Sequence, residues 1–208
     1  MAAVAVALVL GGVSWGSDRI SWHGVREDGW EYIAVGAVKT IGNMPTIWLI
    51  GAFVVGGMSR RPVSGAAAAT LTLAGAVVVY YALIVASGER AGVNLLPAAL
   101  AWAGVAAVAG PVLGAAGGAW SAPHGRRRAV AAGVLGAVFV AMGFFIVARS
   151  FSTPIGILHI CVGAILSLVL AGRGRDRLIG LGTTTTLGVL GGAATLLVFA
   201  AMRMFLRA

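Results

Sequence analysis

Long apolar runs, separated by short polar breaks, fill almost the whole chain and predict seven helices. The runs cover residues 2–15, 31–58, 63–87, 92–118, 129–149, 154–172 and 178–203. A hydrocarbon core about 30 Å thick needs about 20 helical residues, so most of these runs are long enough to cross a membrane. The first would be only about 21 Å long, which leaves open whether it spans. We therefore expect an all-α polytopic bundle of six or seven spans, forming a single integral membrane domain over residues 1–208.

Every second break between the runs carries arginines. The arginine-rich loops are those at residues 59–62, 121–128 and 173–177. Loops rich in Lys and Arg stay on the cytoplasmic side of a membrane, so we expect a plasma-membrane protein with these three loops inside. With seven spans the N-terminus is cytoplasmic and the C-terminus external. With six spans the N-terminus moves outside, and the other helices keep their orientation.

Composition supports a membrane protein and excludes several other classes. The 208 residues are 60% hydrophobic and only 10% charged, too few charges for the surface of a soluble protein of this size. The net charge of +9 comes mainly from arginines beside apolar spans, where they bind lipid phosphates, so membrane lipid is the expected partner and nucleic acid is not. No cofactor is indicated. Cys161 is the only cysteine, so no intramolecular disulfide can form.

The second apolar run is too long for one straight span. As a helix, residues 31–58 would measure about 42 Å, and the run contains a helix-breaking proline at Pro45. We expect a break or kink near Pro45, with residues 30–42, including Lys39, along the outer interface or re-entering the membrane. The preceding loop at residues 16–30 is acidic and rich in Trp, and we expect it to cover the outer face.

Strongly polar side chains within the spans gather between mid-depth and the outer edge of the membrane. Counted at about 1.5 Å per residue from the arginine-marked edges, this set comprises Asn43, Trp48, Tyr80, Asn94 and His159. Because polar groups at such depth usually face the bundle interior or water, we predict an outward-opening substrate pocket lined by these five residues. Structural roles remain as alternatives: an interhelical hydrogen bond for His159, an interfacial position for Tyr80 and a helix cap for Asn43.

Other features favour packing over chemistry. Gly110, Gly114 and Gly118 recur at every fourth residue and form a smooth face for a neighbouring helix, through which we expect a membrane protein partner or a second copy to bind. The four threonines at 183–186 are expected to bond to carbonyls of their own helix or to contact a neighbour. No catalytic or metal-binding motif is present, and His159 and Cys161 would face different sides of one helix. The sequence therefore favours a protein that is not an enzyme. If the protein is an enzyme, His159 is the expected catalytic residue.

Two blocks of residues resemble a family of actinobacterial multi-spanning membrane proteins of uncharacterised function. The first block contains Asn43, Trp48, Ala52-Phe53, Gly56, Arg60-Arg61-Pro62, Gly65 and Tyr80-Tyr81, and the second is Gly110-Pro111-Val112-Leu113-Gly114. The resemblance covers about residues 40–130 and implies the span count but no activity. That family tends to carry an acidic residue in the fifth span, where this chain has Ala141-Met142-Gly143. A looser similarity, in size and Gly/Ala content, is to the substrate-binding membrane subunits of energy-coupling-factor vitamin transporters.

Three functions follow as hypotheses. The favoured one is a substrate-binding or transport subunit with an outward-facing polar pocket for a small-molecule ligand. The alternative is a non-catalytic assembly or partner subunit of a membrane complex. The third is a membrane-embedded enzyme that uses His159.

Overall fold

The computed structural model describes residues 1–19, 45–88, 94–121, 123, 125–149 and 153–205. Within these ranges the chain forms helices and no strand, which confirms the all-α prediction. The helices are α1 (Ala2–Arg19), α3 (Pro45–Met58), α4 (Pro62–Ser87), α5 (Leu96–Trp120), α6 (Arg126–Ala148), α7 (Thr153–Leu170) and α8 (Arg175–Phe205). Apart from the second run, each helix lies within a few residues of the apolar run that predicted it.

Helix length and composition identify an integral membrane protein. Five helices are long and apolar enough to cross a membrane: α4, α5, α6, α7 and the part of α8 over Arg175–Leu197. Their apolar side chains are largely exposed, with Leu71, Val108 and Val169 between 67% and 70% exposed. Because a lipid bilayer solvates such side chains, this surface fits a multi-pass membrane protein.

The two remaining helices differ from the sequence prediction in length. Helix α1 has 18 residues and continues to Arg19, so it extends about 27 Å and not about 21 Å. Helix α3 has 14 residues and begins at Pro45, the expected break. Proline suits the first turn of a helix because the backbone N–H it lacks would have no partner there. Lys39, Asn43 and most of the loop at 16–30 lie outside the described residues.

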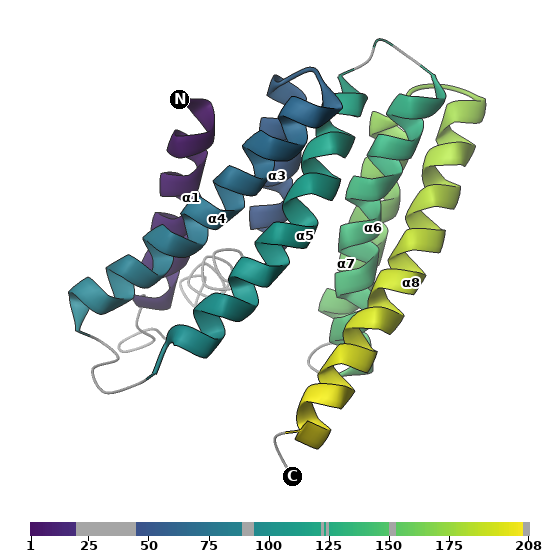
Figure 1. Cartoon of the computed structure of the whole chain (residues 1–208). Coiled ribbons are helices and arrows are strands. Elements are labelled where there is room, and N and C mark those ends of the chain that lie inside the picture. The colour runs from purple at the N-terminus through teal and green to yellow at the C-terminus, as the bar shows by residue number, and fades with distance from the viewer. Residues whose placement is uncertain (20–44, 89–93, 122, 124, 150–152, 206–208) are drawn as a thin grey trace, which may run out of the picture.

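Successive helices run in opposite directions and place the arginine clusters at one end of the molecule (Figure 1). The turns α3–α4, α5–α6 and α7–α8 lie at this arginine end, together with the N-terminus, and α8 finishes at the opposite end. The α5–α6 and α7–α8 turns contain glycines with positive φ, Gly125 at 106° and Gly174 at 55°, in a backbone region that residues with a Cβ rarely adopt. These glycines allow a short connection directly into α6 and α8.

The helices form two groups that meet along α5 and α6 (Figure 1). The N-terminal group contains α1, α3, α4 and α5, with α4 packed against all three of the others. The C-terminal group contains α6, α7 and α8, with α6 packed against both partners. A smaller contact between α3 and α6 completes the junction between the groups.

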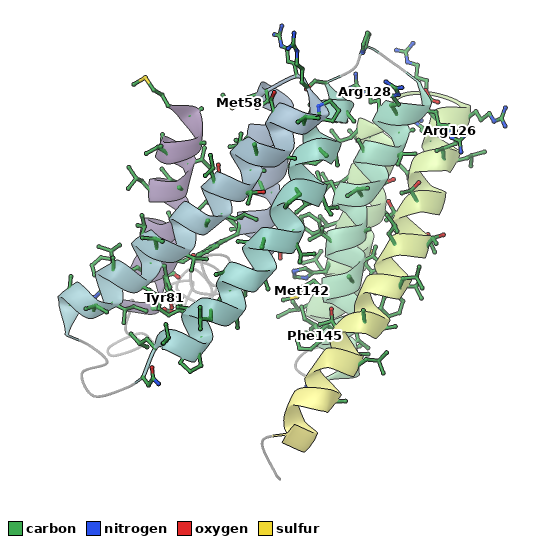
Figure 2. All side chains as sticks on the ribbon, viewed as in Figure 1. Met58, Tyr81, Arg126, Arg128, Met142 and Phe145 are labelled. Carbon is green, nitrogen blue, oxygen red and sulfur yellow. The ribbon has the colours of Figure 1, made fainter. Side chains whose placement is uncertain are left out.

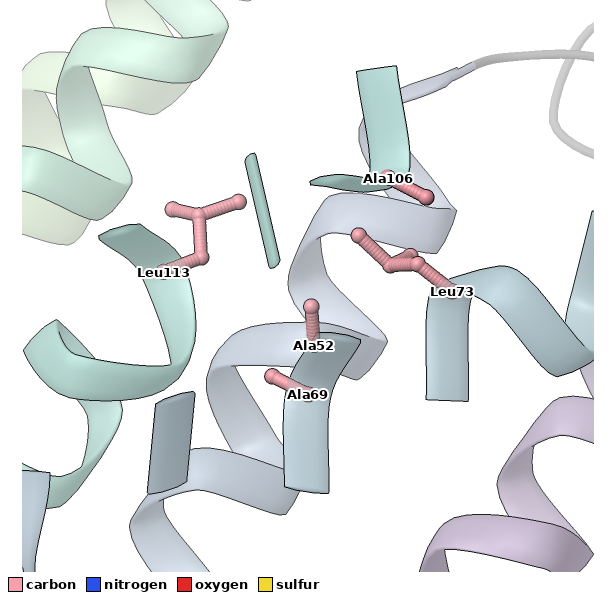
Figure 3. Close-up of a cluster of buried hydrophobic side chains, with 5 residues drawn as sticks. All are labelled: Ala52, Ala69, Leu73, Ala106 and Leu113. Carbon is pink, nitrogen blue, oxygen red and sulfur yellow. The ribbon is translucent and has the colours of Figure 1, made fainter. Parts of the chain in front are cut away.

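The core of the N-terminal group consists of small residues packed where α3, α4 and α5 cross. Figure 3 shows Ala52 from α3 and Ala69 and Leu73 from α4 facing Ala106 and Leu113 from α5. On the same side of α5, a Cβ added at Gly110 would lie 2.6 Å from the Cα of Thr70. Small residues therefore allow the backbones to approach, as is typical of helices in lipid.

The glycine stripe on α5 packs against other helices of the same chain, and binding of a membrane protein partner or a second copy stays a prediction. Gly114 lies against the backbone of Gly65 on α4 and of Gly56 on α3, and Gly118 lies against the backbone of Arg61. The smooth face was predicted correctly, but its neighbours belong to the same chain. A partner protein or a second copy would have to contact another surface.

Glycines and one threonine also join the C-terminal group. Added Cβ atoms at Gly136 and Gly143 of α6 would each lie 2.6 Å from a backbone oxygen of α7, those of Gly163 and Gly156 respectively. Toward α8, the buried Oγ1 of Thr184 donates to the carbonyl oxygen of Gly133 at 3.1 Å. The neighbouring hydroxyls of Thr183 and Thr185 donate within their own helix, to Ile179 and Leu181. Both roles expected for the threonine run are confirmed.

Candidate functional site

Two of the five predicted pocket residues, Trp48 and Tyr80, lie together in the N-terminal group. Their rings meet edge to face with centroids 6.3 Å apart. Nε1 of Trp48 donates to Oγ of Ser14 at 2.7 Å, and the hydroxyl of Tyr80 donates to Oδ2 of Asp18 at 2.5 Å. Both acceptors belong to α1, so these two hydrogen bonds connect α1 to α3 and α4.

Little space remains beside Trp48 for a ligand. Its ring lies 6.3 Å from that of Trp102, which the sequence prediction did not include. The cavity that these two residues line with Leu49, Leu73, Val77, Val105 and Ala106 has a volume of about 20 Å³. That volume accommodates about one water molecule and nothing larger. The arrangement is that of a packed aromatic core.

The other two described members of the set lie elsewhere. Asn94 is exposed before the start of α5, where its Oδ1 accepts a hydrogen bond from the backbone N–H of Leu96 at 3.1 Å. His159 is 8% exposed on α7. Its Nδ1 lies 2.8 Å from the carbonyl oxygen of Ile155, and its ring centroid lies 6.3 Å from that of Phe139 on α6.

These positions divide the predicted pocket. Trp48 and Tyr80 are in the N-terminal group, and His159 is buried between helices of the C-terminal group. The prediction grouped these residues by depth along the bundle, and depth does not say which side of a helix a residue occupies. Asn43 lies outside the described residues. A substrate-binding role for the five side chains stays a prediction.

A larger cleft opens at the arginine end, where the two groups meet. It has a volume of about 860 Å³. Helices α3, α5, α6 and α7 and the turns that follow α3 and α5 all contribute to it. The lining residues are Phe53, Val54, Gly57, Met58, Arg60, Trp120, Ser121, Pro123, Arg128, Leu135 and Leu170. Figure 2 shows Met58 and Arg128 at this end of the molecule, far from Tyr81 and Phe145.

One edge of the cleft is built on the last residue of α7. The final carbonyls of a helix have no partner within it, and here the carbonyl oxygen of Leu170 accepts two side-chain hydrogen bonds. Nε1 of Trp120 and Nε of Arg128 each donate to it at 3.2 Å. The guanidinium carbon of Arg128 also lies 5.0 Å from the centre of the Trp120 ring, within the range of a cation–π contact. The end of α7 is thereby held against α5 and α6.

The cleft combines an apolar floor with a positively charged rim. Phe53 and Leu135 are buried, and the ring of Phe53 lies 6.0 Å from that of Trp120. Arg128 uses Nε for Leu170 and Nη1 for the carbonyl oxygen of Pro123, so three of its five N–H groups have no acceptor within the described residues. Arg60 is exposed, and its side chain forms no hydrogen bond or ion pair there. These donors suit an anionic group.

The sequence contains two features of this cleft, arginine clusters and a nearby tryptophan, but these features by themselves predict only membrane topology. Arg60 and Arg128 belong to two of the three arginine clusters, and Trp120 ends the helix before the second cluster. Trp near Arg at a membrane edge is common, so the pattern alone does not predict a cavity. The cleft depends on α7, whose last residue, Leu170, lies 50 residues after Trp120 and 42 after Arg128 and accepts hydrogen bonds from both. Within the described residues, no group of three His, Cys, Asp or Glu side chains could hold a metal ion.

Comparison with known families places the chain. The model of a family described as "Family of unknown function (DUF6518)" matches residues 33–202. The chain belongs to this family. The match includes every residue that lines the cleft, and it confirms the expected resemblance at the level of an uncharacterised family. Actinobacterial origin and similarity to energy-coupling-factor subunits stay predictions. No curated protein and no solved structure matches the chain.

Proposed function

We propose that this protein is a binding or transport protein of the plasma membrane whose ligand is an anionic amphiphile held in the arginine-end cleft. The observation that carries the proposal is the cleft of about 860 Å³ with Arg60 and Arg128 at its rim. Ligand sites generally measure about 300–1,000 Å³, are mostly apolar and contain a few placed polar groups. The cleft has this size and this character.

Its chemistry selects the class of ligand. An apolar tail would contact Phe53, Trp120 and Leu135, and an anionic head would accept hydrogen bonds from Arg60 and Arg128. Because guanidinium groups bind phosphates and carboxylates through paired donors, the head group is one of these. The position between the two helix groups lets a shift of one group against the other open or close the cleft, as transport requires.

Binding fits the lining better than catalysis does. The polar side chains of the cleft are those of two arginines and Ser121, and the Ser121 hydroxyl donates to the carbonyl oxygen of Gly57 at 2.6 Å. A hydroxyl engaged in this way, with no base among the lining residues, is a poor nucleophile. An assembly role loses its main support because Gly110, Gly114 and Gly118 pack within the chain.

The proposed orientation puts the cleft on the cytoplasmic side, opposite to the outward pocket that the sequence predicted. It rests on the arginine clusters at the turns of one end. We expect an impermeant maleimide, applied to intact cells, to label Ser87→Cys but not Ser59→Cys, both in a Cys161→Ser background. Both serines are half-buried and lie at opposite ends of the bundle, so they form a matched pair. Labelling of Ser59→Cys in intact cells would show that the arginine end faces outward and would contradict the proposed orientation.

The ligand class is tested with dodecyl phosphate as the anionic probe and dodecyl glucoside as the uncharged one. We expect the purified protein to bind dodecyl phosphate more tightly, and Arg60→Gln to weaken that binding about fivefold, since one interfacial arginine contributes about 1 kcal/mol. Native mass spectrometry or calorimetry measures the dissociation constants.

Arg61→Gln is the matched control, because Arg61 is the next residue, is also exposed and does not line the cleft. It should change the affinity less than twofold. Equal losses in the two variants would indicate general surface charge, and equal affinity for the two probes would exclude an anionic ligand. Either result would contradict the proposed function.

A further inference from the structure

A second positively charged surface surrounds the first turn of α6, away from the cleft. Two grooves open there, one on each side of Arg126 and Val130, which line both. The groove between α5 and α6 has a volume of about 470 Å³, and its other lining residues are Ala116, Ala119, Arg127 and Ala131. The groove between α6 and α8 has a volume of about 580 Å³, and its other lining residues are Arg175, Asp176, Ile179 and Thr183.

The arginines of this surface have no partner in the part of the chain that the structure describes. Arg126, Arg127 and Arg175 are exposed, and within the described residues their side chains form no hydrogen bond or ion pair. Asp176 is the one carboxylate that lines either groove, so three positive charges face one negative charge. Helices α6 and α8 begin at Arg126 and Arg175, and the N-terminal ends of helices add partial positive charge. The excess of positive charge favours an anionic ligand at this surface.

Both grooves have apolar side chains among their lining residues, and they lie on helices that are long and apolar enough to span a membrane. Ala116, Ala119 and Ala131 form the floor between α5 and α6, and Val130 and Ile179 are the apolar residues that line the groove between α6 and α8, beside Thr183. Positive charge at the membrane edge above apolar grooves fits a phospholipid, with phosphate on the arginines and acyl chains along the helices. A soluble phosphate would leave the apolar floors uncovered.

We propose that one diphosphatidylglycerol molecule, a lipid with two phosphates and four acyl chains, straddles α6 at this surface. One phosphate binds between Arg126 and Arg127, the other binds between Arg126 and Arg175, and each groove takes acyl chains. The sharing of Arg126 and Val130 argues for one lipid. Only α6, about 10 Å wide, separates the grooves, and two separate monophosphate lipids would compete for Arg126.

This lipid would connect the two helix groups. The first groove includes α5 of the N-terminal group, and the second includes α8 of the C-terminal group. The site is separate from the cleft, because the cleft uses Arg60 and Arg128 and neither groove does. Its test is therefore independent of the proposed function.

Native mass spectrometry of the delipidated full-length protein, titrated with diphosphatidylglycerol and with phosphatidylglycerol, tests the site. We expect one diphosphatidylglycerol to bind at least about tenfold more tightly than the first phosphatidylglycerol. Arg126→Gln should weaken it more than about fivefold, because this residue contacts both phosphates, and Arg127→Gln or Arg175→Gln about fivefold each. Arg61→Gln, an exposed arginine at the same end that lines neither groove, should change it less than twofold.

Three outcomes would overturn the proposal. Two phosphatidylglycerol molecules could bind as tightly as one diphosphatidylglycerol, which would mean independent grooves. Arg61→Gln could weaken binding as much as Arg126→Gln, which would mean nonspecific attraction to charge. Arg60→Gln could weaken diphosphatidylglycerol binding while Arg126→Gln does not, which would move the lipid to the cleft. Arg126→Lys keeps the charge and should retain most of the affinity, which separates binding loss from misfolding.

Discussion

Replacing Gly114 with leucine is expected to prevent the N-terminal group from packing. Gly114 lies where α3, α4 and α5 meet, and even a Cβ at this position would clash with the carbonyl oxygen of Gly65 and lie 2.6 Å from the Cβ of Ala69. Both obstacles are held by helix backbones, which cannot move aside as a flexible side chain would. Overpacking of a core costs about 1–3 kcal/mol and occasionally more. We expect the upper end of that range or beyond, with little folded protein recovered.

Gly104→Leu on the same helix is the matched control. Among the described residues, a Cβ at Gly104 meets nothing within 4 Å, so the added side chain is expected to face the surrounding lipid. Both variants remove a helix-weakening glycine and add the same apolar volume. Thermal unfolding in detergent, monitored by size-exclusion chromatography of heated samples, measures the effect. Gly104→Leu should keep the melting temperature of the unmodified protein, whereas Gly114→Leu should aggregate or have a strongly lowered melting temperature. Similar stability of the two would refute the three-helix junction.

This contrast shows what sequence patterns determine in a membrane protein. Apolar runs give the helices, because each span must satisfy its own backbone hydrogen bonds in lipid. The spacing of Gly110, Gly114 and Gly118 correctly indicated a close helix contact. It did not indicate the neighbour, since an identical glycine face can pack against another chain or against α4 of its own. The neighbour depends on the chain path between helices.

The candidate site was harder to predict for a related reason. Tyr80 and His159 were grouped by depth, yet a membrane helix offers every depth on all its sides, and the side that faces inward follows from packing. The apolar composition of the spans removes the usual guide, because both the lipid-facing and the buried sides are apolar. The arginine-end cleft was missed because Trp120, Arg128 and Leu170 converge only when α7 is in place.

Trp48→Ala is expected to destabilise the protein strongly, because the structure makes Trp48 a central packing residue of the N-terminal group. Its indole contacts the buried cluster around Ala52 and Leu73 and also the smaller cluster around Ala7 and Leu10. Truncating a buried Trp to Ala costs about 3–5 kcal/mol in soluble proteins. We expect a loss of about 3 kcal/mol here, because lipid solvates newly exposed apolar surface better than water does. The lost hydrogen bond to Ser14 contributes under about 1 kcal/mol of that loss.

Comparison with Trp102→Ala separates this packing role from the substrate role that the sequence predicted for Trp48. Trp102 touches the same ring but is 38% exposed, so its truncation leaves a smaller cavity and should lower the melting temperature less. Trp48→Phe should retain much of the stability lost in Trp48→Ala, because an aromatic ring still fills the space between α1 and α5. If Trp48 instead bound a ligand, Trp48→Ala would leave the melting temperature of the ligand-free protein unchanged and abolish only a ligand-dependent increase. Because the cavity beside the ring has a volume of only about 20 Å³, we expect the loss of stability in the ligand-free protein.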